Sequence, residues 1–354
     1  MSTAFATPVM PDAEAFVRCL HRTGTPARVH VIELFLDPEV QEAVCARFDL
    51  LAGLDPRDPA FPLQRQIRIQ QMLGYDYVRC GVDGMTLPGL RNLVVDGRHY
   101  ANEHCGPITN WDEFARYPWP DPAQATTRAL AWYETHLPDG MCLIGSGGFG
   151  HFYEWLSFLM GYETLCYALY EDRALVAAIC AKVLEINEQL LAIMLQFSRV
   201  RVIWGSDDLG FRTGTLISPE DLRELILPGH QAMAARAHAA GRLYLLHSCG
   251  NLSAIMDDLI DTVGIDGKHS FEDTIESVNT AKDLYGSRIA LLGGLDIDFL
   301  CRADEAHIRQ RVRETLSHCL PGGGYCLGTG NSVANYLPLE NYLTMLDEGR
   351  RFAG

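Results

Sequence analysis

The sequence is short of positive charge and has no long apolar run. It holds 29 lysines and arginines against 45 aspartates and glutamates, a formal charge of -16 at pH 7. A surface of this sign would repel a phosphate backbone, so we expect no nucleic-acid partner. No stretch reaches the roughly 18 apolar residues that a membrane-spanning helix needs. The first residues also lack the basic start and apolar core of a secretory signal. We therefore expect no membrane partner and a cytoplasmic location.

The cysteines do not form a disulfide framework, and the chain shows no short repeat or low-complexity tract. There are 11 cysteines, an odd number without tight pairing, which suits a reducing compartment. The apolar fraction of 48% and the charged fraction of 21% are typical of a globular protein with a large core. We predict one domain over residues 1–354.

Short apolar segments alternate along the chain with longer stretches that suit helices. The predicted strands are residues 29–35, 75–80, 141–146, 200–205, 243–247, 265–269, 288–293 and 324–328. Such alternation is typical of a parallel sheet covered by helices, and eight units predict a closed (β/α)8 TIM-type barrel. The competing doubly wound sheet lacks support, because no glycine-rich phosphate fingerprint opens the first helix.

Two regions fall outside this alternation. Residues 1–28 are predicted to form a lead-in with a polar helix. Residues 81–125, rich in glycine, proline and aromatic residues, are predicted to form an irregular insertion with a short hairpin near 92–100. The insertion is interpreted either as a lid over a site or as a surface excursion with aromatic anchors.

Polar side chains follow the predicted strands closely. They are Glu33, Arg79, Cys80, Ser146, Asp207, Asp208, His247, Cys249, Lys268, His269, Asp296 and Cys326. In a barrel of this type the carboxyl ends of the strands meet at one face, where the chemistry takes place. Because burying so many unpaired polar groups would be costly, we expect them to line a pocket.

His247 and Cys249 stand two residues apart at the end of an apolar run and before a glycine turn. Side chains alternate along an extended segment, so both can face one ion. Together with Cys326 from the last strand they predict a zinc site, because zinc prefers thiolate and imidazole ligands. The fourth position is left for Glu33, Asp208, water or substrate. The alternative is that both thiols are buried core groups and His247 is hydrogen-bonded in the wall.

The remaining polar groups have two interpretations each. Glu33 either pairs with Arg79 across neighbouring strands or acts as a ligand or proton acceptor. Asp207 and Asp208 either cap the next segment or line the site. Lys268 and His269 suit an anion, as does Arg79, although Lys268 could equally face solvent. We name Glu33 and Asp208 as candidate catalytic residues, and Arg79, Asp207, Lys268 and His269 as candidate substrate contacts.

Longer motifs make the chain resemble the uroporphyrinogen decarboxylase superfamily. They cover residues 205–210 (GSDDLG), 216–220 (LISPE), 226–228 (ILP), 246–251 (LHSCGN), 292–296 (LGGLD) and 323–331 (GGYCLGTGN). The resemblance implies a single TIM-type barrel. It also implies one of two chemistries, because the superfamily holds metal-free tetrapyrrole decarboxylases and corrinoid-dependent methyltransferases. The decarboxylases carry an arginine-rich loop after the first strand, where this chain has an acidic segment at 32–37.

The methyltransferase branch binds zinc through a His-x-Cys pair and a distant cysteine, which His247, Cys249 and Cys326 match. This resemblance implies Zn2+, a small thiol or methylated donor, and methylcobalamin or another corrinoid carried by a partner corrinoid protein. The direction of methyl transfer stays open, and a homodimer is one option for assembly. The alternatives are a tetrapyrrole decarboxylase and a catalytically silent barrel that binds a small molecule or a corrinoid protein.

Overall fold

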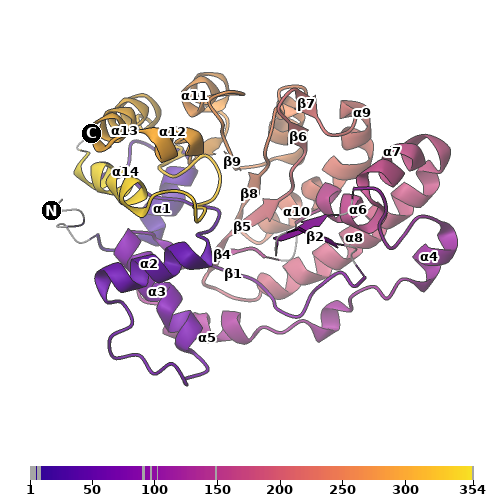
Figure 1. The fold of residues 1–354 in the computed structure, drawn as a ribbon, viewed down its shortest axis with the longest axis horizontal. Coiled ribbons are helices and arrows are strands. Elements are labelled where there is room, and N and C mark those ends of the chain that lie inside the picture. Colours follow the sequence, from indigo (N-terminus) through magenta and orange to yellow (C-terminus); the bar gives the residue numbers. More distant parts are fainter. Residues whose placement is uncertain are drawn as a thin grey trace.

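The computed structural model describes residue 5 and residues 9–89, 92–95, 98–101, 103–147 and 150–352. Seven parallel strands form one curled sheet in which the spatial order follows the chain order (Figure 1). These strands are β1 (Tyr77–Cys80), β4 (Cys142–Gly145), β5 (Val200–Ser206), β8 (Leu243–His247), β9 (Gly267–His269), β10 (Ala290–Leu292) and β11 (Tyr325–Cys326). Each lies inside a segment predicted from its apolar pattern, except that β5 runs one residue past the predicted end at 205, so the predicted parallel sheet is confirmed.

Helices connect successive strands and lie on either side of them in Figure 1. Before β1 come α1 (Ala13–Leu20), α2 (Pro38–Phe48) and α3 (Phe61–Leu73). Between β1 and β5 are α4 (Trp111–Arg116), a 3₁₀ turn at Pro122–Gln124, α5 (Arg128–His136), α6 (Tyr153–Met160), α7 (Tyr162–Glu171) and α8 (Arg173–Met194). After β5 come α9 (Pro219–Asp221), π turns at Leu222–Ile226 and Asp258–Val263, α10 (Leu227–Ala239), α11 (Val278–Tyr285), α12 (Ile297–Arg302), α13 (Glu305–Cys319) and α14 (Leu339–Arg351).

The predicted first strand, 29–35, takes the eighth place in the ring without becoming a regular strand. Val31 makes an isolated parallel bridge to Leu327, beyond the end of β11. On its other side the segment meets β1 through side chains: the Tyr77 hydroxyl donates to the Glu33 carbonyl at 3.2 Å and accepts from the Glu33 backbone N–H at 2.9 Å. Two backbone hydrogen bonds of 2.8 Å join the segment to Leu327. The TIM-type barrel is therefore confirmed, and the seam between this segment and β1 is held by side-chain contacts where a backbone ladder was predicted.

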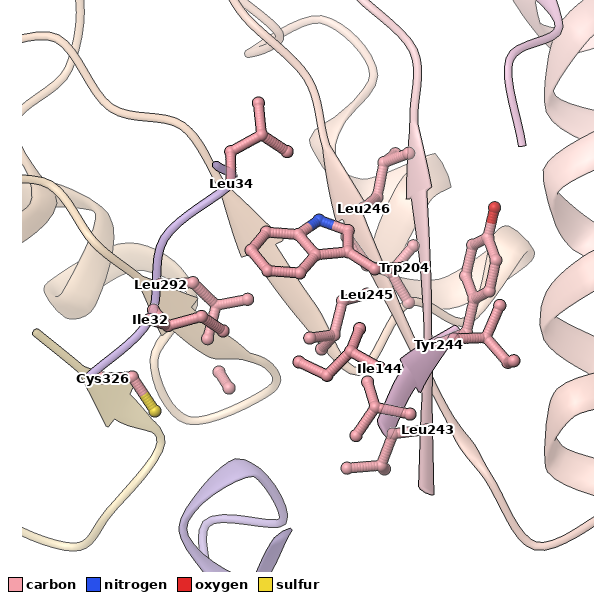
Figure 2. Packing of buried hydrophobic residues seen from close by; sticks show 14 of the residues in the cluster. Ile32, Leu34, Ile144, Trp204, Leu243, Tyr244, Leu245, Leu246, Leu292 and Cys326 are labelled. Atoms are coloured by element: carbon pink, nitrogen blue, oxygen red, sulfur yellow. The ribbon is translucent and has the colours of Figure 1, made fainter. Parts of the chain in front are cut away.

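The interior of the barrel is filled by apolar side chains from the inner faces of the strands. Ile144, Trp204, Leu245 and Leu292 are each no more than 1% exposed, and Figure 2 shows them packed together with Ile32. Tyr244, next to Leu245 on β8, points to the opposite side. This alternation follows from the period of two along a strand.

The insertion after β1 contains the predicted hairpin, whose strands are β2 (Asn92–Val95) and β3 (Arg98–Ala101). A second hairpin, β6 (Gly210–Phe211) with β7 (Gly214–Thr215), follows β5. The stretch 147–150 (GGFG), whose glycines predict a turn after the third strand, includes residues 148 and 149, which lie outside the described residues. Within the described part of the chain, no helix combines the length and apolar character needed to cross a bilayer.

Candidate metal centre at the mouth of the barrel

Strand β8 delivers two metal-binding side chains to the barrel mouth. His247 is its last residue and lies beside Ser206 of β5 and His269 of β9. Cys249 follows two residues later, and its Sγ lies 3.4 Å from His247 Nε2. The chain then turns at Gly250, whose φ of +84° is one that glycine adopts without strain. The predicted convergence of this imidazole and this thiol is therefore present in the structure.

Asp208 completes a group of three around this pair. Its Oδ1 accepts the Cys249 backbone N–H at 2.9 Å and lies 3.5 Å from His247 Nε2. Ligand atoms of Asp208, His247 and Cys249 all lie within 4.8 Å of one another. Burial opposes the charge on Asp208, but hydrogen bonds from His247 and Cys249 outweigh it and lower its pKa to about 2. An ionised carboxylate thus faces the pair.

The second ring nitrogen of His247 is held by His269. The two Nδ1 atoms are 2.8 Å apart, so one of them carries the shared proton. Burial lowers the pKa of both rings, which keeps both neutral near pH 7. Without a metal, the Nε2 proton of His247 faces Asp208, and Nδ1 accepts from His269. A metal at this site would take the place of the Nε2 proton, and His247 would then donate from Nδ1 to His269. An outer imidazole that fixes the tautomer of a ligand in this way is typical of metal sites.

The Cys249 thiol has two polar neighbours that the sequence did not single out. Asn331 Nδ2 donates to Sγ at 3.4 Å, and Ser270 Oγ lies at 3.7 Å. Burial, with the charge of Asp208, raises the pKa of Cys249 to about 12, so without a cation the sulfur keeps its proton. The motif at 323–331 contained Asn331, but its side-chain direction could not be read from a glycine-rich turn.

Cys326 does not join this group, and the prediction that it binds the same ion with His247 and Cys249 is wrong in this geometry. It is fully buried beside Ile32 and Leu292 in the apolar interior (Figure 2). Its thiol contacts that of Cys19 on α1. The physical reason is the stagger between neighbouring barrel strands, which places Cys326 below the mouth. Residues later in the chain, Asn331 among them, reach the mouth from this strand.

The two aspartates after β5 have separate roles. Asp207 is fully buried and accepts backbone N–H groups of Tyr153 and Glu154 at 2.9 Å, at the start of α6. Its Oδ2 also lies 3.0 Å from His230 Nε2. Asp207 therefore caps a helix and is not placed as a substrate contact, whereas Asp208 faces the candidate metal ligands. The sequence left this choice open.

Glu33 and Arg79 both lie near the mouth but do not pair with each other. The Glu33 carboxylate accepts the Thr329 backbone N–H at 2.7 Å and the Thr329 hydroxyl at 2.6 Å. Burial raises the pKa of Glu33 to about 8. Arg79 donates to Ser146 Oγ at 3.1 Å and stacks over the Trp204 ring at 4.8 Å. The alternative of a Glu33–Arg79 ion pair therefore fails, and Glu33 stays available for proton exchange.

Lys268 is buried on the outer side of β9. Its Nζ donates to the Ser270 carbonyl at 2.5 Å and lies 4.3 Å from the centroid of the Phe271 ring. Burial lowers its pKa to about 8. The alternative of a solvent-facing Lys268 is therefore wrong. With Ser270, it lines a small cavity of about 100 Å³ next to the Cys249 loop.

Two larger cavities open beside the candidate metal centre. One of about 920 Å³ is lined by Asn331, with Phe299 and Tyr336 at its sides. The other, of about 540 Å³, is lined by Asp208 and by residues of α6 and of the β6–β7 hairpin. Both volumes suit small molecules. Because Asp208 and Asn331 each contact Cys249, a ligand in either cavity would be close to the metal-binding group.

The fold and the site together define a TIM-type barrel with a candidate metal centre at the carboxyl ends of its strands. The chain belongs to the uroporphyrinogen decarboxylase (URO-D) family, whose model matches residues 97–352. This confirms the family resemblance predicted from the motifs.

Two curated relatives resemble part of the chain. A stretch of 130 residues is 33% identical to a methylated-thiol–coenzyme M methyltransferase of Methanosarcina mazei, covering 36% of this chain and 32% of that protein. A stretch of 134 residues is 27% identical to a uroporphyrinogen decarboxylase of Syntrophotalea carbinolica, covering 38% of each. The matched stretches thus span about a third of the first relative and 38% of the second.

The fold also has a solved counterpart, a methyltransferase from Methanosarcina mazei. It aligns with a TM-score of 0.69 at 18% identity and covers 96% of this chain and 98% of that one. At this identity the likeness supports the barrel fold.

Proposed function

We propose that this protein is a zinc-dependent methyltransferase, which moves a methyl group between a corrinoid on a partner protein and a small thiol or methylated donor. The observation that carries the proposal is the convergence of Asp208, His247 and Cys249 at the mouth of the barrel. The partial similarity to a methylated-thiol–coenzyme M methyltransferase supports the same reaction class.

The donor set fits zinc. One imidazole nitrogen, one thiol sulfur and one carboxylate oxygen are ligands that zinc accepts, and three protein ligands leave a fourth position for substrate. His269 would orient His247, and Asn331 would orient Cys249. Zinc bound there would supply Lewis acidity that lowers the pKa of a substrate thiol.

The residues around the metal-binding group would accept the proton of the substrate thiol and position the thiol of Cys249. Glu33 exchanges a proton near neutral pH, because its pKa is raised to about 8. Thr329 links Glu33 to the Asn331 carbonyl, with a hydroxyl-to-carbonyl distance of 3.3 Å, and Asn331 in turn contacts Cys249. We propose that the ionised fraction of Glu33 accepts the substrate proton, while Thr329 and Asn331 position this carboxyl group and the Cys249 thiol. We further propose that the partner corrinoid protein approaches over the cavity beside Asn331.

Zinc content tests this proposal. Wild type, purified without chelator, is expected to hold about one zinc ion per chain, as structural and catalytic sites do. Cys249→Ser should lose most of it. Cys326→Ser is the matched control, because it removes a buried thiol outside the group. Equal zinc in wild type and Cys249→Ser, or zinc lost only in Cys326→Ser, would overturn the assignment.

A methyl-transfer assay then separates the remaining functions. Free methylcobalamin can replace the partner protein. The absorbance of the cobalamin would then report its demethylation in the presence of a small thiol. A zinc-loaded chain inactive in both directions would favour the silent barrel. A zinc-free chain would favour the decarboxylase, the activity named for the second relative. The geometry gives that alternative less support, because Arg79 is tied to Ser146 and Lys268 to Ser270.

A further inference from the structure

The cavity of about 540 Å³ beside Asp208 has a lining of unusual charge. Carboxylates of Glu103, Glu154 and Asp208 line it, and none of its lining residues is a lysine or arginine. His151 is the basic neighbour of Glu154, with Nδ1 at 2.6 Å from Oε2. Arg212, at the tip of the β6–β7 hairpin, is exposed and is not among the lining residues. His151 offsets part of the charge of Glu154, and a metal bound to Asp208 would offset the charge there, but Glu103 has no basic partner among the lining residues. The cavity therefore favours cations over anions.

Aromatic rings supply much of the rest of its wall. Phe158 and Tyr162 come from α6 and α7, and Phe211 comes from the β6–β7 hairpin. The Tyr162 hydroxyl donates to the Leu216 carbonyl at 2.8 Å, which fixes this ring. Phe211 is 64% exposed at the rim, where a ligand would cover it. Rings beside carboxylates are the means by which proteins hold methylated cations, because such cations offer no N–H donors and interact with ring faces.

We propose that this cavity binds the cationic head group of the substrate, a small methylated ammonium or sulfonium compound. The cation-binding site is inferred from the lining of the cavity alone, whereas its role as the substrate site rests on the function proposed above. Asp208 belongs both to the cavity and to the metal-binding group, so the methyl groups of a head group held in the cavity would lie beside the reaction centre. The same lining disfavours substrates that carry a sulfonate or carboxylate.

Titration calorimetry on the full chain tests the proposal with choline as the probe. Its uncharged isostere, in which a tert-butyl group replaces the trimethylammonium group, should bind roughly tenfold more weakly, because it loses the cation–π and charge terms. The hydroxyethyl dimethylsulfonium ion is the second probe, and the tighter of the two cations identifies the head group. Ethanesulfonate, an anion of similar size, should not bind.

Variants locate the binding. Phe211→Ala removes an exposed ring that the fold does not need, and should weaken choline binding roughly fivefold. Glu154→Gln should weaken it roughly tenfold. Glu185→Gln is the matched control, because this carboxylate pairs with Lys182 on the surface of α8, away from the cavity. Equal affinity for choline and its isostere, or unchanged choline binding in both Phe211→Ala and Glu154→Gln, would overturn the cation site.

The Cys249→Ser variant separates this inference from the proposed function. Choline binding that persists in a zinc-free Cys249→Ser chain supports a cation site independent of the metal. If wild type holds zinc but does not prefer the cations, the inference fails and the proposed function stands. If wild type binds choline selectively but holds no zinc, the proposed function fails and the cation site stands.

Discussion

Glu33 gives the sharpest prediction, because its carboxyl group is buried without a basic partner among the described residues. It is 2% exposed, and its partners are the backbone N–H and hydroxyl of Thr329. Burial raises its pKa from 4.5 to about 8. Between these values the folded chain keeps a proton that the unfolded chain has released. The stability that this proton provides is complete below pH 4.5 and is lost as pH rises through about 8.

The size of the effect follows from the shift. Between pH 4.5 and about 8, each unit of rising pH should lower the free energy of unfolding by about 1.4 kcal/mol. From 4.5 to 7 is 2.5 units, so at pH 7 the buried acid should cost about 3 kcal/mol relative to a side chain that does not titrate. Glu33→Gln supplies such a side chain. Its amide can accept the Thr329 N–H and donate to the Thr329 hydroxyl, which can turn to the Asn331 carbonyl at 3.3 Å.

Urea unfolding at several pH values, with chelator present, measures this difference. Between pH 5.5 and pH 7.5, the advantage of Glu33→Gln over wild type should grow by about 2.7 kcal/mol. Glu340→Gln is the control, because this exposed carboxylate pairs with Arg47 at the surface and should show no such trend. A difference between Glu33→Gln and wild type that stays constant with pH would refute the argument that Glu33 is protonated in the folded chain.

The other predictions concern roles that the structure separates. Asp207→Asn should lower the free energy of unfolding in urea by about 2 kcal/mol, because it weakens a buried helix cap, and should leave the zinc content unchanged. Asp208→Asn should lower the zinc content with little loss of stability. The reverse pattern would exchange the two roles. His269→Ala should weaken zinc affinity roughly 10- to 100-fold in a chelator competition, since it removes the group that orients a metal ligand; unchanged affinity would count against that role. Gly328→Ala should prevent stable closure of the barrel, because its Cβ would lie 1.9 Å from the backbone carbonyl oxygen of Ile32. Gly214→Ala is the control and should fold normally, because its Cβ would meet nothing within 4 Å. Solubility and thermal unfolding compare the two variants, and equal behaviour would contradict the steric argument.

The alternation of apolar strands with helices was enough to predict the barrel, because burial of one helix face and of both strand faces leaves a local periodic signal. The closing seam left no such signal. Segment 29–33 is as apolar as a strand, yet whether it forms a ladder depends on its neighbours. At this seam Tyr77 fills the gap with its hydroxyl and His30 pairs with Asp76, with Nδ1 2.7 Å from Oδ2.

At the site, the sequence by itself determined that His247 and Cys249 face the same way, because a separation of two residues on an extended chain fixes this locally. It also placed Asp208 among the candidates, but could not separate its role from that of Asp207. Only the tertiary structure decided that Asp208 is the third member of the group, that Cys326 lies below the mouth, and that Asn331 contacts the thiol instead. The physical reason is that the stagger between strands sets the height of each side chain in a barrel, and stagger depends on how whole strands pair and not on any short stretch of sequence.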